Sequence, residues 1–189
     1  MSTHIFLGLT FLSNFEIMLK GKHVHLRALE EEDLKILKNW RNSDFVRVTT
    51  REYLFLNMIN QKNWFESIHK DKPPKFIMFG IENNKKILIG VCGLTYIDWK
   101  NSHAEVSIYI GKKNWQKSKE ATDTLQLITE YGFGELHLHR LWAEIYDTAP
   151  ENVILFEKMD FNKEGTLRDQ LWRNRKWHNS FLYAKISKL

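Results

Sequence analysis

Residues 103–161 read HAEVSIYI (103–110), GKKNWQKSK (111–119), EATDTLQLITEYGFGEL (120–136), HRLWAEIY (139–146) and ENVILFEKMDF (151–161). The pattern predicts a strand, a lysine-rich turn, a helix, a second strand and a short helix. Where the first loop enters the helix, several backbone N–H groups lack a partner and the helix dipole is positive. A phosphate group can bind at such a place. This stretch therefore favours an α/β unit that holds a phosphorylated cofactor, although its loop lacks the usual glycines.

The same reasoning extends to the flanking residues. Val24 and Leu26 alternate with polar residues as in a half-buried strand, and Leu34, Leu37 and Trp40 have helical spacing after an acidic start. Further elements are expected in these ranges: a helix over about 60–70, a hairpin over 76–82 and 86–97 with its turn at 83–84, and a terminal hairpin over 162–171 and 177–186. The order predicts one α/β domain of the α+β type, with a mixed, mostly antiparallel sheet of about six or seven strands and about four helices.

Composition narrows the class of protein. At 43% hydrophobic residues the chain can bury a core, and its net charge of +5 favours anionic partners such as nucleotides or CoA-type cofactors. The single cysteine, Cys92, lies in an apolar run and is expected to be a buried thiol, which suits a reducing cytoplasm. Residues 1–17 are expected to be an N-terminal extension to a domain over 18–189. Their apolar run of about eight residues is too short to span a bilayer, so no membrane partner is expected.

The sequence gives no support for a metal site or for three common catalytic or nucleotide-binding motifs. His23 with His25 and His137 with His139 form i, i+2 pairs without an accompanying set of cysteines or carboxylates, so we expect no metal. The chain contains none of the motifs G-x-x-x-x-G-K-[ST], G-x-S-x-G or H-E-x-x-H.

Seven segments in order resemble the GNAT acetyltransferase superfamily over roughly residues 20–186: HLRALEEEDL, NWRNSDFVR, IGVCGLTYID, AEVSIYIG, EYGFGELHLHRLWAEIY, LFEKMDF and KEGTLRD. The chain looks like the branch that includes ribosomal-protein N-terminal acetyltransferases and amino-sugar acetyltransferases, and NWRNSDFVR is similar to the start of the latter. The resemblance implies a GNAT fold and transfer of an acetyl group from acetyl-CoA to a primary amine by direct attack.

The resemblance also implies a cofactor site, made of residues from three segments. The backbone after the strand would bind the thioester and pantetheine, the next loop the pyrophosphate, and the last helix would complete the site: Ser107, Ile108, Tyr109 and Ile110; Gln116, Lys117, Ser118, Lys119, Glu120 and Ala121; Asn152, Phe156 and Lys158. The loop departs from the glycine-rich pattern of the family, and its lysines offer a charge that offsets the missing backbone contacts. The alternatives are a solvated lysine turn and a plain helix cap at Ser118.

Glu105 matches the position at which many relatives carry a glutamate near the acceptor amine. The resemblance implies that it deprotonates the amine through a water or positions it. The alternative is a solvated strand residue. Phe156 stands where many relatives have a tyrosine that protonates the leaving thiolate, and a phenyl ring cannot donate a proton. Tyr109, Tyr146, Ser107 or water could take that role.

The acceptor would meet residues after the first helix: Trp40, Arg41 and Asn42. Arg41 suits a phosphate or carboxylate and is equally read as a surface arginine paired with Glu or Asp, whereas Trp40 is read first as a core residue. The acceptor expected from the resemblance is an amino-sugar nucleotide or a protein N-terminus. The competing hypothesis is a GNAT-like protein that binds CoA, acyl-CoA or nucleic acid without turnover; under the leading one, nucleic acid is not a partner. The oligomeric state stays open, and a homodimer through the terminal hairpin or a sheet edge fits the pattern.

Overall fold

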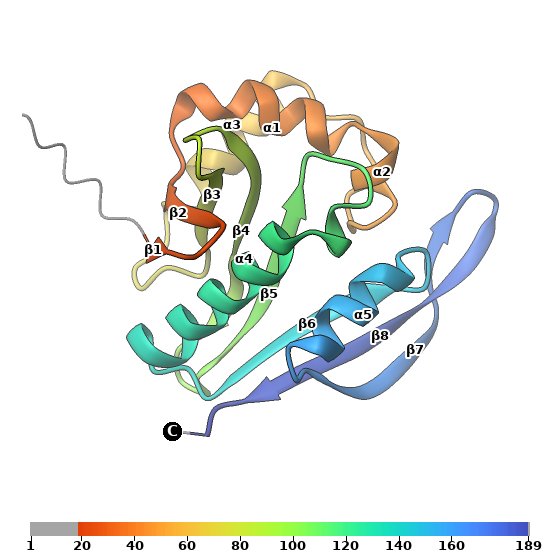
Figure 1. Ribbon diagram of the computed structural model, residues 1–189. Helices are drawn as coiled ribbons and strands as arrows, with labels where there is room; N and C mark the ends of the chain where they lie inside the picture. The colour runs from red at the N-terminus through yellow and green to blue at the C-terminus, as the bar shows by residue number, and fades with distance from the viewer. Residues whose placement is uncertain (1–18, 189) are drawn as a thin grey trace, which may run out of the picture.

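The computed structural model describes residues 19–188, which form an eight-stranded sheet with helices on both faces (Figure 1). The strands lie in the order β1-β2-β3-β4-β5-β6-β8-β7. Their bounds are β1 Leu19–Lys20, β2 Val24–Ala28, β3 Ile77–Asn83, β4 Leu88–Asp98, β5 His103–Ile110, β6 Arg140–Tyr146, β7 Asn162–Arg173 and β8 Lys176–Ile186. The α-helices are α1 Leu34–Arg41, α2 Asp44–Arg47, α3 Met58–Ser67, α4 Lys119–Glu130 and α5 Pro150–Lys158. The expected α/β domain with a mixed sheet is confirmed, and the proposed extension over residues 1–17 lies outside the described residues.

β5 and β6 form the one parallel pair among these strands, and they separate after three residues. Their register runs from His103 opposite Arg140 to Glu105 opposite Trp142. Beyond Glu105, β5 stays paired with β4, and β6 stays paired with β8, so the sheet opens into two halves (Figure 1). Within residues 19–188, the backbone groups of β5 that point into this opening have no ladder partner. The fold therefore leaves hydrogen-bonding backbone exposed on the inner edge of the opening.

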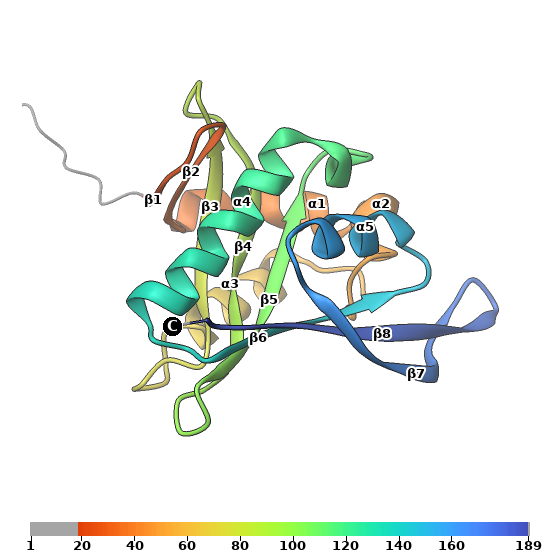
Figure 2. The ribbon, with the colours of Figure 1, turned by 60° about the horizontal axis from the view of Figure 1, so that its bottom comes forward.

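Side-chain alternation along β5 separates the two faces of the sheet. Ala104 and Val106 are buried in the core that also contains Leu125 and Ile128 of α4. Glu105 and Tyr109 therefore point to the opposite face. Figure 2 shows α4 and α5 over one face of the sheet, with α1 and α3 behind it. We call the sheet face that carries Glu105 and Tyr109 the acceptor face, because the resemblance implies an acceptor amine near Glu105.

The helix expected over 120–136 ends earlier than the sequence suggests. α4 stops at Glu130, and a π-helical turn, Tyr131–Glu135, carries the chain to the next strand. Gly132 allows a close approach here, because a Cβ at this position would lie 3.1 Å from a methyl group of Leu141. The wider turn thus brings the helix end against the core at the start of β6.

The two hairpins expected from the sequence are both present. β3 and β4 pair antiparallel around a turn that begins at Asn83, and β7 and β8 pair antiparallel to form the far edge of the sheet. The helix expected over about 60–70 is α3, shifted by a few residues. The sequence did not indicate the two-residue strand β1 or the single turn of α2, since neither is long enough to show a periodicity.

Candidate active site

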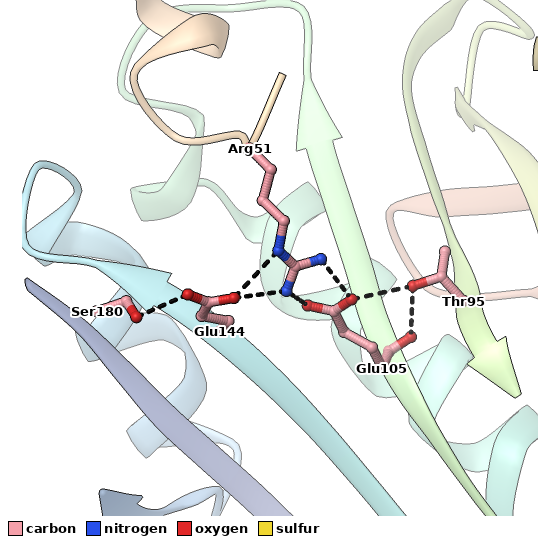
Figure 3. Close-up of polar contacts among 5 residues, drawn as sticks. All are labelled: Arg51, Thr95, Glu105, Glu144 and Ser180. Atoms are coloured by element: carbon pink, nitrogen blue, oxygen red, sulfur yellow. Dashed lines mark hydrogen bonds and ion pairs between the residues drawn. The ribbon is translucent and has the colours of Figure 1, made fainter. Parts of the chain in front are cut away.

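Two buried carboxylates meet on the acceptor face where β5 and β6 separate, and both bind Arg51 (Figure 3). Glu105 comes from β5 and Glu144 from β6, with side chains only 8% and 7% exposed. The Arg51 guanidinium donates to both oxygens of Glu105, through Nη1 at 2.9 Å and Nη2 at 2.5 Å. It also donates to Oε2 of Glu144, through Nε at 3.1 Å and Nη2 at 2.7 Å. One cation thus bridges two carboxylates that belong to opposite sides of the opening.

Hydroxyl groups complete the hydrogen bonding of the two carboxylates. The Thr95 hydroxyl lies 3.3 Å from Oε2 of Glu105, and the Ser180 hydroxyl donates to Oε1 of Glu144 at 2.7 Å. All four carboxylate oxygens are therefore occupied. Burial alone would lower the pKa of the Arg51 guanidinium, but its bonds to Glu105 and Glu144 raise that pKa above the ordinary value. Two carboxylates and one guanidinium leave a single net negative charge at this site.

The loop that carries Arg51 is anchored on both sides of it. Nη2 of Arg173, from the end of β7, donates to the carbonyls of residues 50, 51 and 52 at 3.1–3.3 Å. Asn42 holds the other end through both groups of its side-chain amide, which pair with the N–H and carbonyl of Leu56 at 2.7 and 2.8 Å. The observed contacts of Asn42 are therefore with its own chain, and its role in binding an acceptor stays a prediction.

Two tyrosines flank the opening on the acceptor face. Burial raises the pKa of Tyr109 to about 12, against the opposing charge of Arg41. Burial, followed by the charge of Glu144, raises the pKa of Tyr146 to about 12 as well. Both hydroxyls are therefore protonated at neutral pH and able to donate a hydrogen bond, and the raised pKa makes each a weaker acid than an ordinary tyrosine.

Arg41 and Trp40, which were expected to wall the acceptor site, lie at the end of α1 beside the end of β5. The Cζ atom of Arg41 is 6.0 Å from the centre of the Tyr109 ring, and among residues 19–188 Arg41 has no carboxylate partner. Trp40 packs against the core and lies so close to Gly111 that a Cβ there would collide with its ring. Arg41 is thus placed near the opening, while Trp40 has mainly a packing role.

A hollow of about 420 Å³ lies beside the mouth of the opening. Its walls come from three segments that follow α1, β5 and β6: Asp44, Phe45, Val48 and Thr49; Lys113, Asn114, Trp115 and Gln116; Thr148, Ala149 and Glu151. The Thr148 hydroxyl donates to the Val48 carbonyl at 2.7 Å, which ties the acceptor loop to the end of β6. The hollow is large enough for the arm of a cofactor and lies at the same mouth as the free backbone edge of β5.

The expected phosphate cradle is a helix N-terminus surrounded by lysines. Ser118 caps α4, since its hydroxyl accepts from the N–H of Ala121 at 3.1 Å. A second hollow, of about 520 Å³, has walls that include Lys20, Lys22, Lys117, Lys119 and Lys158, together with Asp123 and Glu130. The lysines come from the start of the domain, the loop before α4 and the end of α5. The sequence indicated Lys117, Lys119 and Lys158, and the fold adds Lys20 and Lys22.

Helix α5 contributes less to a cofactor surface than expected. Phe156 is only 3% exposed and packs edge-on against Phe161, with ring centres 5.0 Å apart. It is thus a core residue in this structure, and its part in cofactor binding stays a prediction. The Oδ1 atom of Asn152 is buried without a hydrogen-bond partner among the described residues, and its part in cofactor binding stays a prediction.

Comparison with known proteins identifies the family of the chain. Residues 26–182 match the acetyltransferase (GNAT) domain family. The chain belongs to the GNAT acetyltransferase family. It is similar to the spermidine N(1)-acetyltransferase of Vibrio cholerae, with 26% identity over 82% of this chain and 87% of that protein. An uncharacterized N-acetyltransferase of Bacillus subtilis, YoaA, is 27% identical over 89% of this chain and 96% of its own length.

A solved structure of the spermidine N-acetyltransferase of Vibrio cholerae, in complex with CoA and spermine, has the same fold. Its TM-score is 0.79 at 24% identity, covering 86% of this chain and 95% of that one. Another structure of the Vibrio cholerae enzyme, described as dodecameric, has a TM-score of 0.73 at 25% identity, covering 86% of this chain and 93% of that one. The eight-stranded arrangement found here is therefore a GNAT arrangement.

Membership in the GNAT family makes the protein an acetyl-CoA-dependent N-acetyltransferase, as the resemblance implied, rather than a scaffold without turnover. The narrower branch expected from residues 39–47 gains no support, because the relatives named above are spermidine acetyltransferases or enzymes of uncharacterized substrate. None of the helices within residues 19–188 is long and apolar enough to cross a membrane.

Four polar residues of the site were missed from the sequence: Arg51, Thr95, Glu144 and Ser180. Glu144 shares its strand face with Trp142 and Tyr146, so the alternation of β6 could have placed it on the acceptor side. Ser180 lies in a strand that was predicted, but its partner depends on the register between β6 and β8. Arg51 lies in an irregular loop, where no periodicity reveals the direction of a side chain.

Proposed function

We propose that this GNAT acetyltransferase transfers the acetyl group of acetyl-CoA to a primary amine of a polyamine such as spermidine. The observation that carries the proposal is the carboxylate pair Glu105 and Glu144, which already binds a cation at the opening of the sheet. Two carboxylates that satisfy a guanidinium also suit an ammonium ion, which carries donors only. The spermidine N-acetyltransferases among the relatives support the same class of acceptor.

Each requirement of the reaction has a candidate in the opening. Acetyl-CoA supplies a thioester carbonyl for attack by the amine nitrogen. Glu105 orients the ammonium group of the acceptor and takes its proton, directly or through a water. The unpaired backbone of residues 107–110 faces the same opening, where N–H groups would polarise the carbonyl oxygen. Tyr109 or Tyr146 would offer a proton to the leaving thiolate, in place of the tyrosine that Phe156 replaces.

The assay for this proposal follows thiol release from acetyl-CoA with spermidine, spermine and n-butylamine as acceptors. We expect kcat/KM for spermidine to exceed that for butylamine by about 10-fold or more, because a second ammonium gains attraction from the net negative site. The product is checked by mass, which must rise by one acetyl group. Thiol release no faster than in buffer with either polyamine would contradict the proposal.

Removing two lysines from the cradle should weaken the binding of acetyl-CoA without changing the rate of the chemical step. We expect Lys117→Ala with Lys119→Ala to raise the Kd of acetyl-CoA about 10-fold, measured by calorimetry, since each lysine loses a charge-assisted contact to phosphate. The matched control is Lys35→Ala with Lys70→Ala, which removes the same charge from exposed positions that do not line the cradle. If the lysines bind the 3′-phosphate, the wild type should bind 3′-dephospho-CoA more weakly than CoA. The double variant without these lysines should bind the two with similar Kd values. Equal Kd values for both double variants would mean that the cradle lysines are solvated and do not contact the cofactor.

A second candidate acceptor, an amino-sugar nucleotide, rests on Arg41. This arginine lies over Tyr109 near the opening and has no carboxylate partner among residues 19–188. An unpaired guanidinium suits a phosphate group of the acceptor. Including a nucleotide-linked amino sugar in the same assay decides between the two, and preference for it should vanish in Arg41→Ala. The homodimer expected from the sheet edge stays a prediction.

A further inference from the structure

The guanidinium of Arg51 covers the two carboxylates that would receive the acceptor. Glu105 and Glu144 are 8% and 7% exposed in their side chains, whereas the Arg51 side chain is 43% exposed. Nη2 of Arg51 lies 2.5 Å from one carboxylate and 2.7 Å from the other, so a single nitrogen takes the position between them. An ammonium nitrogen that bonds both carboxylates would need this same position.

The hydrogen bonds at the site leave no room for both cations. Each oxygen of Glu105 and Glu144 already accepts from Arg51 or Ser180. A second cation placed against the same oxygens would meet the guanidinium as a like charge at short distance. An acceptor ammonium can therefore bind both carboxylates only after the Arg51 side chain has moved away.

The fold allows the Arg51 side chain to leave while its loop stays in place. The backbone on either side is held by Arg173 and, further along, by Asn42. The guanidinium lies at the end of a long flexible side chain that is already half exposed, and a rotamer change alone would carry it into solvent. A second arrangement, with the guanidinium in solvent, is thus compatible with a fixed loop.

We propose that Arg51 is an internal competitor of the acceptor amine, which sets the KM of the acceptor by occupying its ammonium position. The inference rests on the proposed role of the carboxylate pair Glu105 and Glu144 as the acceptor site. The apparent affinity of a ligand falls by the fraction of molecules in which its site is open. Arg51 thus determines how tightly an acceptor ammonium must bind the open site before the acceptor is acetylated at a given concentration.

Removal of the competitor is tested with Arg51→Ala. We expect the KM of spermidine and of n-butylamine to fall by about the same factor, roughly 10-fold, while kcat stays within about 2-fold, because every acceptor displaces the same side chain. Arg51→Lys keeps a charge without the planar fork and should give an intermediate KM. A kcat at least about 10-fold lower with an unchanged or higher KM would overturn the proposal and make Arg51 a residue that orients Glu105.

Free guanidinium provides a second readout that does not depend on turnover. In Arg51→Ala, guanidinium ion at low millimolar concentration should refill the vacated position, raise the melting temperature and compete with the acceptor amine. The wild type should show neither effect, because its own guanidinium is in place. Arg47→Ala is the matched control, since Arg47 packs on the Phe55 ring at 4.3 Å and should respond like the wild type. An Arg51→Ala protein that folds but gains no stabilisation from guanidinium would overturn the inference.

The two readouts separate failure of the inference from failure of the proposed function. If no polyamine is acetylated, yet guanidinium stabilises only Arg51→Ala, the cation site stands and the acceptor class is wrong. If polyamines are acetylated but the KM in Arg51→Ala is unchanged, the acceptor class stands and Arg51 does not compete.

Discussion

Glu105→Gln is expected to lower kcat by about 10²–10⁴-fold, the range that a positioned general base contributes. Glutamine has the shape of glutamate, and its carbonyl oxygen can still accept from Arg51 and Thr95. It cannot accept the proton of the acceptor ammonium, because an amide is not basic at neutral pH. The loss should therefore fall on kcat, measured by thiol release at saturating acetyl-CoA and amine. The melting temperature should also drop, because the amide NH2 takes the place of one of the two oxygens that accept from Arg51.

Glu144→Gln is the matched control for Glu105→Gln. Glu144 binds the same guanidinium from the other strand, and its side chain is equally buried. It lies on β6, away from the unpaired edge of β5, so it is proposed to bind the ammonium without taking its proton. Glu144→Gln should therefore raise the KM of the amine and leave kcat within about 3-fold. If Glu105→Gln behaves in the same way, Glu105 binds the acceptor and some other group takes the proton.

The difference between these two glutamates explains how far the sequence could predict the site. Glu105 was indicated by the family resemblance, which places a glutamate at this position, and period-two alternation adds that it shares the face of Ser107 and Tyr109. Its pairing with Glu144 requires the parallel register between β5 and β6 and the point at which they separate. Both depend on how a strand pairs with another nearly 40 residues later along the chain, which no local pattern contains.

Packing in the structure explains why phenylalanine is tolerated at position 156, where many relatives have tyrosine. The family resemblance predicts that a proton donor is missing at this position. The structure adds that the ring is buried edge-on against Phe161. A hydroxyl at this place would need a partner in an apolar environment. The proton donor is therefore sought on the acceptor face, where two tyrosines with raised pKa values lie beside the opening.

Arg27→Met is expected to destabilise the fold by about 3–5 kcal/mol, because it removes the one counter-charge that two buried carboxylates have within residues 19–188. Arg27 of β2 donates to Asp33 at 2.7 and 2.9 Å, and to Glu82 of β3 at 2.6 Å. Both carboxylate side chains are 10% exposed. The network joins the sheet to the start of α1, whose end carries the acceptor-side residues. Denaturant unfolding gives the loss, and the triple variant Arg27→Met, Asp33→Asn, Glu82→Gln should recover part of it.

The pH dependence of this variant has a definite sign. Burial raises the pKa of Asp33, but the bonds from Arg27 and from the Glu30 N–H outweigh burial and leave that pKa below its ordinary value. A lowered pKa gives stability that is present above the unfolded value, about 4, and is lost as the pH falls through the folded value. In Arg27→Met, burial acts without this compensation, so protonation of Asp33 relieves the variant while it weakens the wild type. The difference in unfolding free energy between the two proteins should therefore start to shrink above about pH 4, as Asp33 of the variant is protonated, and should shrink further below about pH 4, as the wild type loses the contribution of its ionised Asp33. A difference that stays constant from pH 7 to pH 3 would mean that Asp33 is not held ionised by Arg27.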